Sequence, residues 1–420
     1  MASIRPRILA VLHGFIPSAM ITVVKPLVEL HRAGRLRARI ILESLATPGD
    51  IRRADLVVFC RNMEPKHASL LDAARARRIP FLYDLDDNLF EVPPDCDVGR
   101  YCRAPERQAM LTEYLRAADL VRVYSKTLEA RVAALNPRVE RTFAPIDLDQ
   151  VAVAPASQPT DEISIVYATS RVRDDLSRIF LPALGRVLAE YPGRVRAHFW
   201  GHKPAILPTG ASHHRPVCQY DHFLRRFSRA GFQIGLAPLA DDQFYRSKTN
   251  NKFREYGACG IAGIYSNVDV YSDCVTDGRT GLLAANNSDD WYGAMVRLIE
   301  DRPLRTGIQE RARACVREHY SQGKFEQVFW REIEDLLGSP ARRLPGPPCK
   351  KALTSPKAPS LKRGGVLRRI RQLGPQGTWN SLRWAANDGW TLLRLRCRLW
   401  TPLADLRERL SRGRGLPPSL

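Results

Sequence analysis

The sequence lacks the cysteine patterns that cross-link small domains or bind zinc. Its nine cysteines include no C-x-x-C pair, and their number is odd, which argues against a disulfide framework and a zinc ribbon. Scattered thiols are typical of a reducing cytoplasm. The chain also lacks any uninterrupted run of about 18 apolar residues, the length that a transmembrane helix needs. The sequence is therefore not that of a multispanning membrane protein.

The first 24 residues partly mimic an export signal. Residues 1–7 are basic and residues 8–24 are mostly apolar, as in a signal peptide. However, His13, Gly14 and Pro17 interrupt the apolar run. We therefore expect a buried strand followed by a helix here, with an export signal or membrane anchor as the alternative.

Acidic residues are scarce at the C-terminal end. The 420 residues carry a net charge of +21. Residues 341–420 contain 18 Lys and Arg but only three acids, so +15 of the charge lies there and +6 remains for the first 340 residues. A strongly basic segment favours a polyanionic partner, so such a partner is expected for residues 341–420. Residues 1–340 have the composition of an ordinary globular protein.

Short apolar segments alternate with helical ones twice along the chain. The first series begins at Ile8 and the second at Ile163, and residues 144–161, which are rich in Pro, Ala and Ser, indicate a hinge between them. Such alternation predicts parallel sheets covered on both faces by helices. We therefore expect an α/β fold with two Rossmann-like doubly wound domains that face a cleft, where ligands bind at the carboxyl ends of the strands.

These patterns divide the chain into four parts. Residues 1–148 form the first predicted domain and residues 149–338 the second. Residues 339–365 form a Pro-rich linker. Residues 366–420 form a basic tail. Its apolar residues recur at spacings of three or four and predict an amphipathic helix, at Trp379, Leu382, Ala386, Trp390, Leu393, Cys397 and Trp400.

The most informative segment of the chain is residues 245–266. Asn250 suits the N-cap of a helix and Gly260 its C-terminal stop. The amides at such a helix start, together with Lys248 in the preceding loop, favour a phosphate or another anion. The alternative is an ordinary surface helix, in which Lys252 and Glu255 form an i, i+3 pair.

This segment and the next 55 or so residues resemble the group 1 (family 4) retaining glycosyltransferases. The resemblance extends over about residues 5–335, more weakly in the N-terminal half. The matching positions are Lys252, Phe253, Glu255, Tyr256, Gly257, Ala258, Gly260, Ser266, Tyr271, Val275, Asp277, Gly278, Thr280, Gly281, Leu282, Leu283, Ala312, Arg313, Tyr320 and Ser321.

The resemblance implies a GT-B fold whose second domain binds the nucleotide of the donor and whose first domain faces the acceptor. Glu255 matches the second glutamate of the E-x7-E motif, which is expected to hold the ribose. The first glutamate is replaced by Ser247, so its contact is absent or replaced. Arg171 and Arg173 lie where family members grip the diphosphate, and Gly14 is what remains of a glycine pair that approaches the donor.

The resemblance also implies the reaction, which is transfer of a hexose from a nucleotide-diphospho-sugar with retention of configuration. We expect Lys248 and the loop around Asn250 and Asn251 to stabilise the charge that develops on the diphosphate. Lys252 is also expected to bind the donor. No metal and no cofactor are expected, since the nucleotide sugar is a substrate.

Three acids follow a predicted strand in the string FLYDLDDNLFE, residues 81–91. Asp86 falls where many family members have a histidine near the reacting sugar, so Asp86 and Asp87 are the predicted catalytic residues of the first domain. The same string also resembles a Mg²⁺-dependent phosphatase motif, with Asp84 as nucleophile and Asp86 as general acid. Further alternatives are a metal-binding D-x-D of the other glycosyltransferase architecture and a purely structural turn.

The expected acceptor is a cell-surface glycan or a lipid-linked precursor. We expect a cytoplasmic protein that lies peripherally on the inner face of the membrane, where residues 366–420 contact anionic lipid. Nucleic acid is not expected as a partner, and the alternative for the tail is a helix packed on the enzyme. Because Ser247 replaces a motif residue, a non-catalytic protein that binds sugar nucleotides is the second functional hypothesis.

Overall fold

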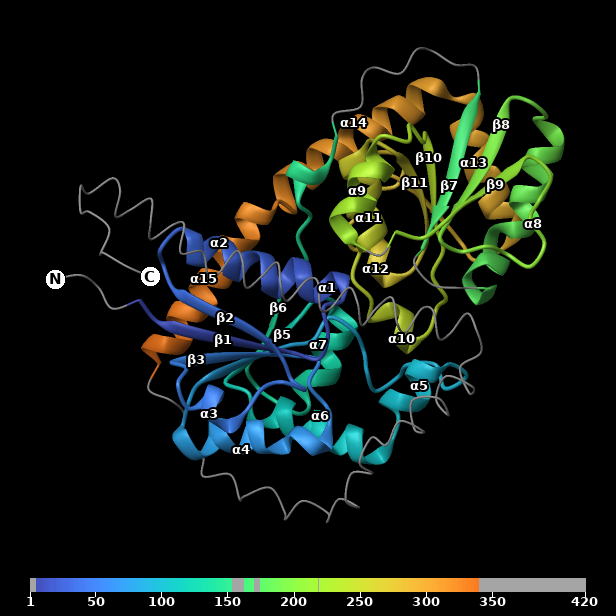
Figure 1. Cartoon of the computed structure of the whole chain (residues 1–420). Helices are drawn as coiled ribbons and strands as arrows, with labels where there is room; N and C mark the ends of the chain where they lie inside the picture. The colour runs from blue at the N-terminus through green and yellow to red at the C-terminus, as the bar shows by residue number, and fades with distance from the viewer. Residues whose placement is uncertain (1–4, 153–161, 170–173, 218, 340–420) are drawn as a thin grey trace, which may run out of the picture.

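The computed structural model describes residues 5–152, 162–169, 174–217 and 219–339. Two parallel six-stranded sheets, each covered by helices, form two domains (Figure 1). The predicted fold class of two Rossmann-like doubly wound domains is confirmed. The predicted linker and tail lie outside the described residues.

The first sheet has the strand order β2-β1-β3-β4-β5-β6. Its strands are β1 (Arg7–Leu12), β2 (Arg37–Leu42), β3 (Leu56–Cys60), β4 (Phe81–Asp84), β5 (Leu120–Val123) and β6 (Val139–Arg141). Its helices are α1 (Pro17–Ala19), η1 (Met20–Val24), α2 (Lys25–Arg32), α3 (Pro48–Ile51), η2 (Pro65–His67), α4 (Ala68–Arg77), α5 (Asp97–Cys102), α6 (Pro105–Ala117) and α7 (Lys126–Ala133). Residues 8–24, which mimic an export signal, form a buried inner strand and the helical segment after it.

The second sheet has the strand order β12-β11-β10-β7-β8-β9. Its strands are β7 (Ile163–Ala168), β8 (Val195–Trp200), β9 (Ala211–His214), β10 (Ile234–Ala237), β11 (Ala262–Ser266) and β12 (Leu282–Ala284). The short turn η3 (Leu148–Gln150) precedes it, and its helices are α8 (Asp174–Glu190), α9 (Tyr220–Ser228), α10 (Gln243–Arg246), α11 (Asn251–Cys259), α12 (Asp269–Ser272), α13 (Ser288–Glu300) and α14 (Arg302–His319).

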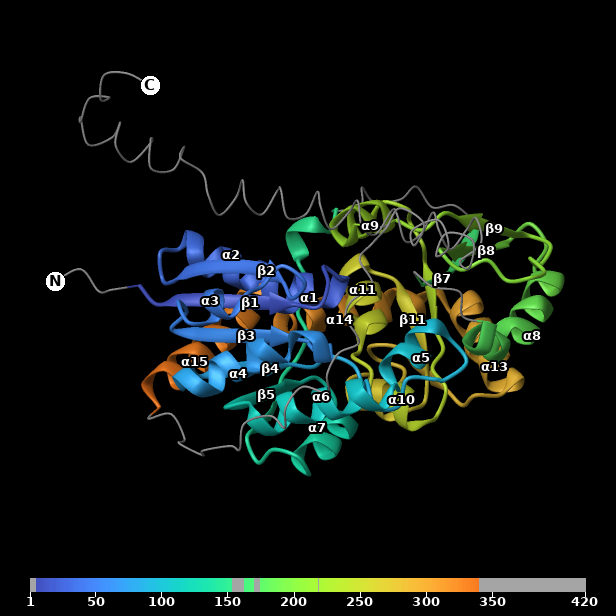
Figure 2. The same cartoon turned by 60° about the horizontal axis from the view of Figure 1, so that its bottom comes forward.

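The last described helix, α15 (Gln322–Gly338), returns to the first domain. Its buried residues Phe325, Phe329 and Ile333 share a core with β1 and α2, and Figures 1 and 2 show α15 beside the first sheet. The predicted second domain, residues 149–338, includes this helix. The packing corrects that part of the assignment, because the apolar face of α15 is buried on the first domain.

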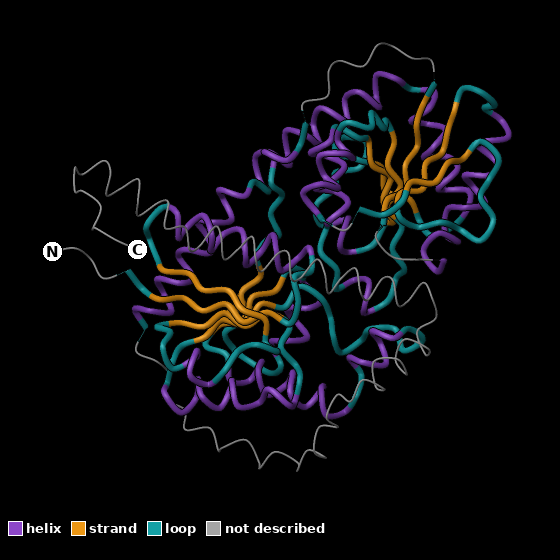
Figure 3. The backbone as a smooth tube through the Cα atoms, in the orientation of Figure 1, coloured by secondary structure: helices purple, strands orange, loops and turns teal. Residues whose placement is uncertain are grey.

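All strands within each sheet are parallel, so their carboxyl ends meet at one edge. In both domains that edge faces the junction between them (Figure 3). Residues that follow the strands of one domain therefore meet residues that follow the strands of the other.

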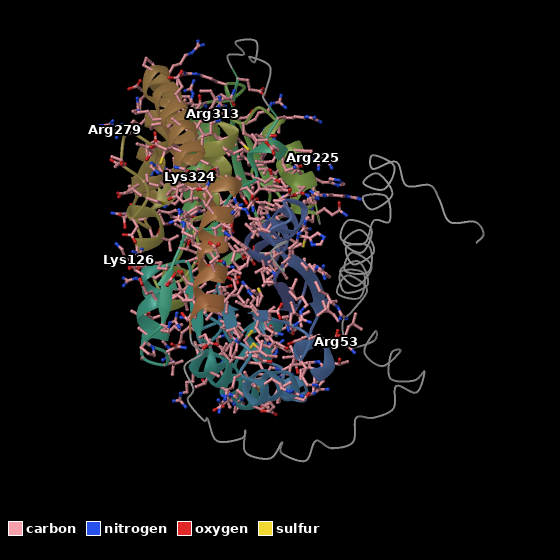
Figure 4. The ribbon with its side chains drawn as sticks, turned by 90° about the vertical axis from the view of Figure 1, so that its left-hand side faces the viewer. Arg53, Lys126, Arg225, Arg279, Arg313 and Lys324 are labelled. Carbon is pink, nitrogen blue, oxygen red and sulfur yellow. The ribbon has the colours of Figure 1, made fainter. Side chains whose placement is uncertain are left out.

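The exposed charge of the body is spread over both domains. The labelled basic side chains in Figure 4 include Arg53 and Lys126 on the first domain and Arg225 and Arg279 on the second. No helix in the described part of the chain has the length and apolar character needed to cross a bilayer.

Candidate active site between the domains

The three acids at the end of β4 have different partners, and Asp84, the last residue of the strand, is the most deeply buried of them. Its Oδ1 accepts hydrogen bonds from Arg122 Nε at 2.8 Å and from the Tyr124 hydroxyl at 2.6 Å, and its Oδ2 accepts one from Thr22 at 3.0 Å. The side chain is fully buried. A phosphatase nucleophile must be accessible, so the structure does not support the alternative in which Asp84 attacks phosphorus.

Asp86 is held by Arg61, which follows β3. Arg61 donates to both carboxylate oxygens, at 2.5 and 2.7 Å. Burial raises the pKa of Asp86, but the charge and hydrogen bonds of Arg61 outweigh burial and hold the pKa below its usual value. Asp86 is therefore an anion at neutral pH. No sequence pattern indicated Arg61 as a site residue. Its backbone has a φ of 58°, in the left-handed region that non-glycine residues rarely adopt.

Asp87 joins the two domains through Lys248. The ammonium group of Lys248 donates to both oxygens of Asp87, at 2.7 and 2.8 Å, and lies 3.8 Å from the centre of the Phe244 ring. Asp87 is also 3.6 Å from Arg61. The structure thus brings together Asp86, Asp87 and Lys248, which the sequence predicted as the catalytic residues. With Arg61 they form a row of alternating negative and positive charges: Asp86, Arg61, Asp87 and Lys248.

Ser247 is a buried contact between the domains. Its hydroxyl donates to the carbonyl of Gln243 at 2.6 Å and accepts from Asn88 at 3.2 Å. Its own carbonyl accepts from Ser125 at 3.0 Å. The position at which the family motif has a glutamate is therefore occupied by a small hydroxyl group that bonds to the first domain.

Asn250 and Asn251 lie at the start of α11, where their side chains hold the buried Arg254. Arg254 Nε donates to Asn250 Oδ1 at 3.0 Å, and another of its nitrogens donates to Asn251 Oδ1. Asn250 occupies the N-cap, as predicted, but its side chain makes no capping hydrogen bond and instead donates to the Tyr320 hydroxyl at 3.1 Å. Both amides therefore shape the loop that carries Lys248.

Glu255 lies on α11 with 5% of its surface exposed. One oxygen accepts from Lys252 at 2.5 Å and the other from the Tyr220 hydroxyl at 3.2 Å. The i, i+3 pair that the sequence predicted as the structural alternative is thus present. The tyrosine of α9 adds a partner that the sequence did not indicate.

The remaining predicted residues are less informative. Gly14 lies in the loop after β1, where an added Cβ would meet only Ile16, at 4.0 Å, so the backbone does not require a glycine there. Arg171 and Arg173 lie outside the described residues.

A cavity of about 460 Å³ lies between the domains beside this cluster. Lys248 and Asn250 reach it from the second domain, and Ser125, Lys126 and Arg141 line it from the first. Among the described residues, no group of three or more His, Cys, Asp or Glu side chains is arranged to hold a metal ion. The charged side chains of the cluster described above, Asp86, Asp87, Arg61 and Lys248, are paired with one another.

No protein-family model matches this sequence, and no curated protein is significantly similar to it. The arrangement of the two domains nevertheless identifies the fold class. Two Rossmann-like domains that face one another through the carboxyl edges of their sheets form the GT-B fold of glycosyltransferases. The predicted fold resemblance is therefore confirmed.

Solved structures of this class cover most of the chain. HepE from Anabaena, crystallised with UDP-glucose, covers 79% of this chain and 100% of its own, with 14% identity and a TM-score of 0.59. Sucrose-phosphate synthase from Thermosynechococcus elongatus covers 79% and 99%, with 14% identity and a TM-score of 0.59. A glycosyltransferase from Rickettsia africae covers 80% and 99%, with 13% identity and a TM-score of 0.57. At these identities the likeness establishes the fold alone.

Proposed function

We propose that this protein is a glycosyltransferase that moves a hexose from a nucleotide-diphospho-sugar to a hydroxylated acceptor, with retention of configuration. The observation that carries the proposal is Lys248, a cation of the second domain that is held at the junction by Asp87 of the first. Proteins of the same fold have been crystallised with UDP-glucose and with UDP. A mobile ammonium group is suited to a diphosphate.

The proposed mechanism is stabilisation of the leaving group. The diphosphate displaces Asp87 from Lys248, and the amides at the start of α11 add further positive potential. Arg171 and Arg173 are proposed to assist, and Glu255 to bind the ribose in exchange for Lys252. Asp86 and Asp87 then face the sugar and acceptor from the first domain, and domain closure excludes water that would hydrolyse the donor. In this proposal basic side chains and amides supply the charge stabilisation, and the nucleotide sugar enters as a substrate.

Replacing Glu255 with glutamine is expected to raise KM for the nucleotide sugar by about 10- to 100-fold, because a charged acceptor of ribose hydrogen bonds is lost. The measurement is nucleotide release by the purified protein with UDP-, GDP- and ADP-sugars. Glu310→Gln, at an exposed position on α14, is the matched control and is expected to behave as wild type. An unchanged KM in Glu255→Gln would contradict the ribose assignment.

The same assay separates catalysis from binding alone. A protein that only binds sugar nucleotides gives saturable donor binding by calorimetry but no nucleotide release. Ser247, at the position of a motif glutamate, is the observation that favours this second candidate. Nucleotide release that depends on Lys248 would exclude it.

We propose a cell-surface glycan or a lipid-linked precursor as the acceptor, on the inner face of the membrane. The support is the composition of residues 366–420, where tryptophans and other apolar residues recur at spacings of three or four among arginines. Such a segment binds anionic lipid by apolar insertion together with about 1 kcal/mol per basic residue.

Deletion of residues 366–420 is expected to lower binding to vesicles containing phosphatidylglycerol by at least about tenfold. Co-sedimentation measures it, with pure phosphatidylcholine vesicles as the control for charge. Nucleotide release in solution should persist, because all the described helices and strands of both domains come from residues before 340. Equal sedimentation of the full and shortened chains would refute the membrane role.

A further inference from the structure

His13 and Glu43 form a dyad that the mechanism above does not use. His13 follows β1 and Glu43 follows β2. His13 Nδ1 lies 2.6 Å from Glu43 Oε1, and the other Glu43 oxygen accepts from Asn62 Nδ2 at 2.8 Å. The Glu43 side chain is 5% exposed, whereas that of His13 is 39% exposed.

This geometry fixes which nitrogen of His13 carries a lone pair. A carboxylate oxygen accepts hydrogen bonds, so His13 donates from Nδ1, and in the neutral form of the ring Nε2 is then the nitrogen that can accept a hydrogen bond. Burying a carboxylate is unfavourable unless it is hydrogen-bonded, and here both oxygens of Glu43 are. The buried acid thus holds a partly exposed histidine in one orientation and one tautomer.

The dyad lies at the same sheet edge as the predicted catalytic acids. The His13 amide donates to the carbonyl of Cys60 at 3.1 Å. The next residue after Cys60 is Arg61, which binds Asp86. β1 and β3 are neighbours in the sheet, so His13, just after β1, lies beside the residue that precedes Arg61.

An aromatic ring accompanies the histidine. The Tyr101 ring centre is 5.7 Å from that of His13. The Tyr101 hydroxyl donates to Glu64, and the Arg107 guanidinium lies 4.1 Å from the centre of the tyrosine ring. Two partners thus fix Tyr101, and a fixed aromatic ring beside a hydrogen-bond acceptor is typical of sites that bind ligands with both apolar and polar faces.

We infer that His13, Glu43 and Tyr101 form the acceptor subsite, and that His13 Nε2 accepts a hydrogen bond from a hydroxyl group of a sugar or polyol acceptor. Glu43 is the positioning residue that orients the ring and holds the proton of the neutral imidazole on Nδ1. This inference rests on the proposed function, and it specifies a hydroxyl-rich acceptor bound at the carboxyl ends of β1 and β2.

The test uses the full chain with isotope-labelled histidine, saturated with UDP, and methyl α-D-glucopyranoside as the probe. We expect the His13 ring signals to show the Nδ1–H tautomer and to shift as the probe is added. His13→Phe keeps a flat ring but removes the acceptor nitrogen, and should raise the probe Kd by roughly three- to tenfold. Glu43→Gln should change the tautomer signal and raise the same Kd.

The affinity for UDP, measured by calorimetry, should stay at the wild-type value in both variants, and the exposed His222→Phe should change neither constant. His13 signals that do not move with the probe, or an unchanged probe Kd in His13→Phe, would overturn the inference. Failure of the proposed function gives a different result, namely no nucleotide release by the wild-type protein from any donor while the His13 signals still respond to the probe.

Discussion

Replacing Lys248 with methionine is expected to lower kcat for nucleotide release by about 100- to 1000-fold, the typical cost of removing one donor that stabilises a developing anion. Lys248 is the cation that the structure places at the junction of the two carboxyl edges, 2.7 Å from Asp87. Methionine keeps most of the length of the side chain and its contact with Phe244. The fall should therefore reflect lost charge. Steady-state kinetics with a saturating donor measures it.

Lys324→Met is the matched control. Lys324 lies on α15 with an exposed side chain and does not line the cavity between the domains. We expect kcat within about twofold of wild type. Equal rates in Lys248→Met and Lys324→Met would show that Lys248 does not stabilise the leaving group.

Replacing Arg122 with methionine is expected to destabilise the first domain by about 3–5 kcal/mol, the usual cost of removing one partner from a buried ion pair. Arg122 is fully buried between Asp84 of β4 and Glu332 of α15, at 2.8 Å from each. Burial raises the pKa of Glu332 to about 7, and the charge of Arg122 opposes that rise. Without the arginine, two carboxyl groups remain buried together.

Urea unfolding followed by circular dichroism measures this loss. Arg186→Met is the control, because it removes an exposed pair with Asp289 and should cost less than about 1 kcal/mol. An Arg122 variant as stable as this control would mean that the buried network contributes little. Hydrogen exchange should also show faster exchange in α15, which Arg122 ties to the first sheet.

The start and end of α11 could be predicted from the sequence alone. Asn250 and Gly260 predicted a helix over 251–259, which are its observed bounds, and Gly260 adopts the left-handed φ of 70° that a helix stop requires. Such local signals do not depend on the rest of the fold. They place Lys248 just before the helix, in the loop where the structure has it.

The partners of the acids could not be predicted, because they come from distant parts of the chain. Asp84, Asp86 and Asp87 stand within four residues of one another, yet their cations are Arg122 of β5, Arg61 after β3 and Lys248 of the other domain. The order of the strands in the first sheet brings Arg61 and Arg122 to the acids, and the packing of the two domains brings Lys248 to Asp87.

The sequence did not predict the short edge strands β9 and β12 or the position of the final helix α15, because these too depend on contacts with distant parts of the chain. β9 and β12 have only four and three residues, and β9 is polar, so neither has the apolar run that predicts a strand. The apolar face of α15 fits equally well on either domain until the fold is known.

The route of α15 has a consequence for how the protein is anchored. The chain passes from the first domain to the second near Ile146 and comes back near Ser321, and these two crossings lie side by side, joined by a backbone hydrogen bond of 2.8 Å from Ile146 to Tyr320. The segment after Gly338 therefore leaves from the first domain. A surface that binds residues 341–420, which carry a charge of +15, would therefore hold the first domain, the half of the molecule that we propose binds the acceptor.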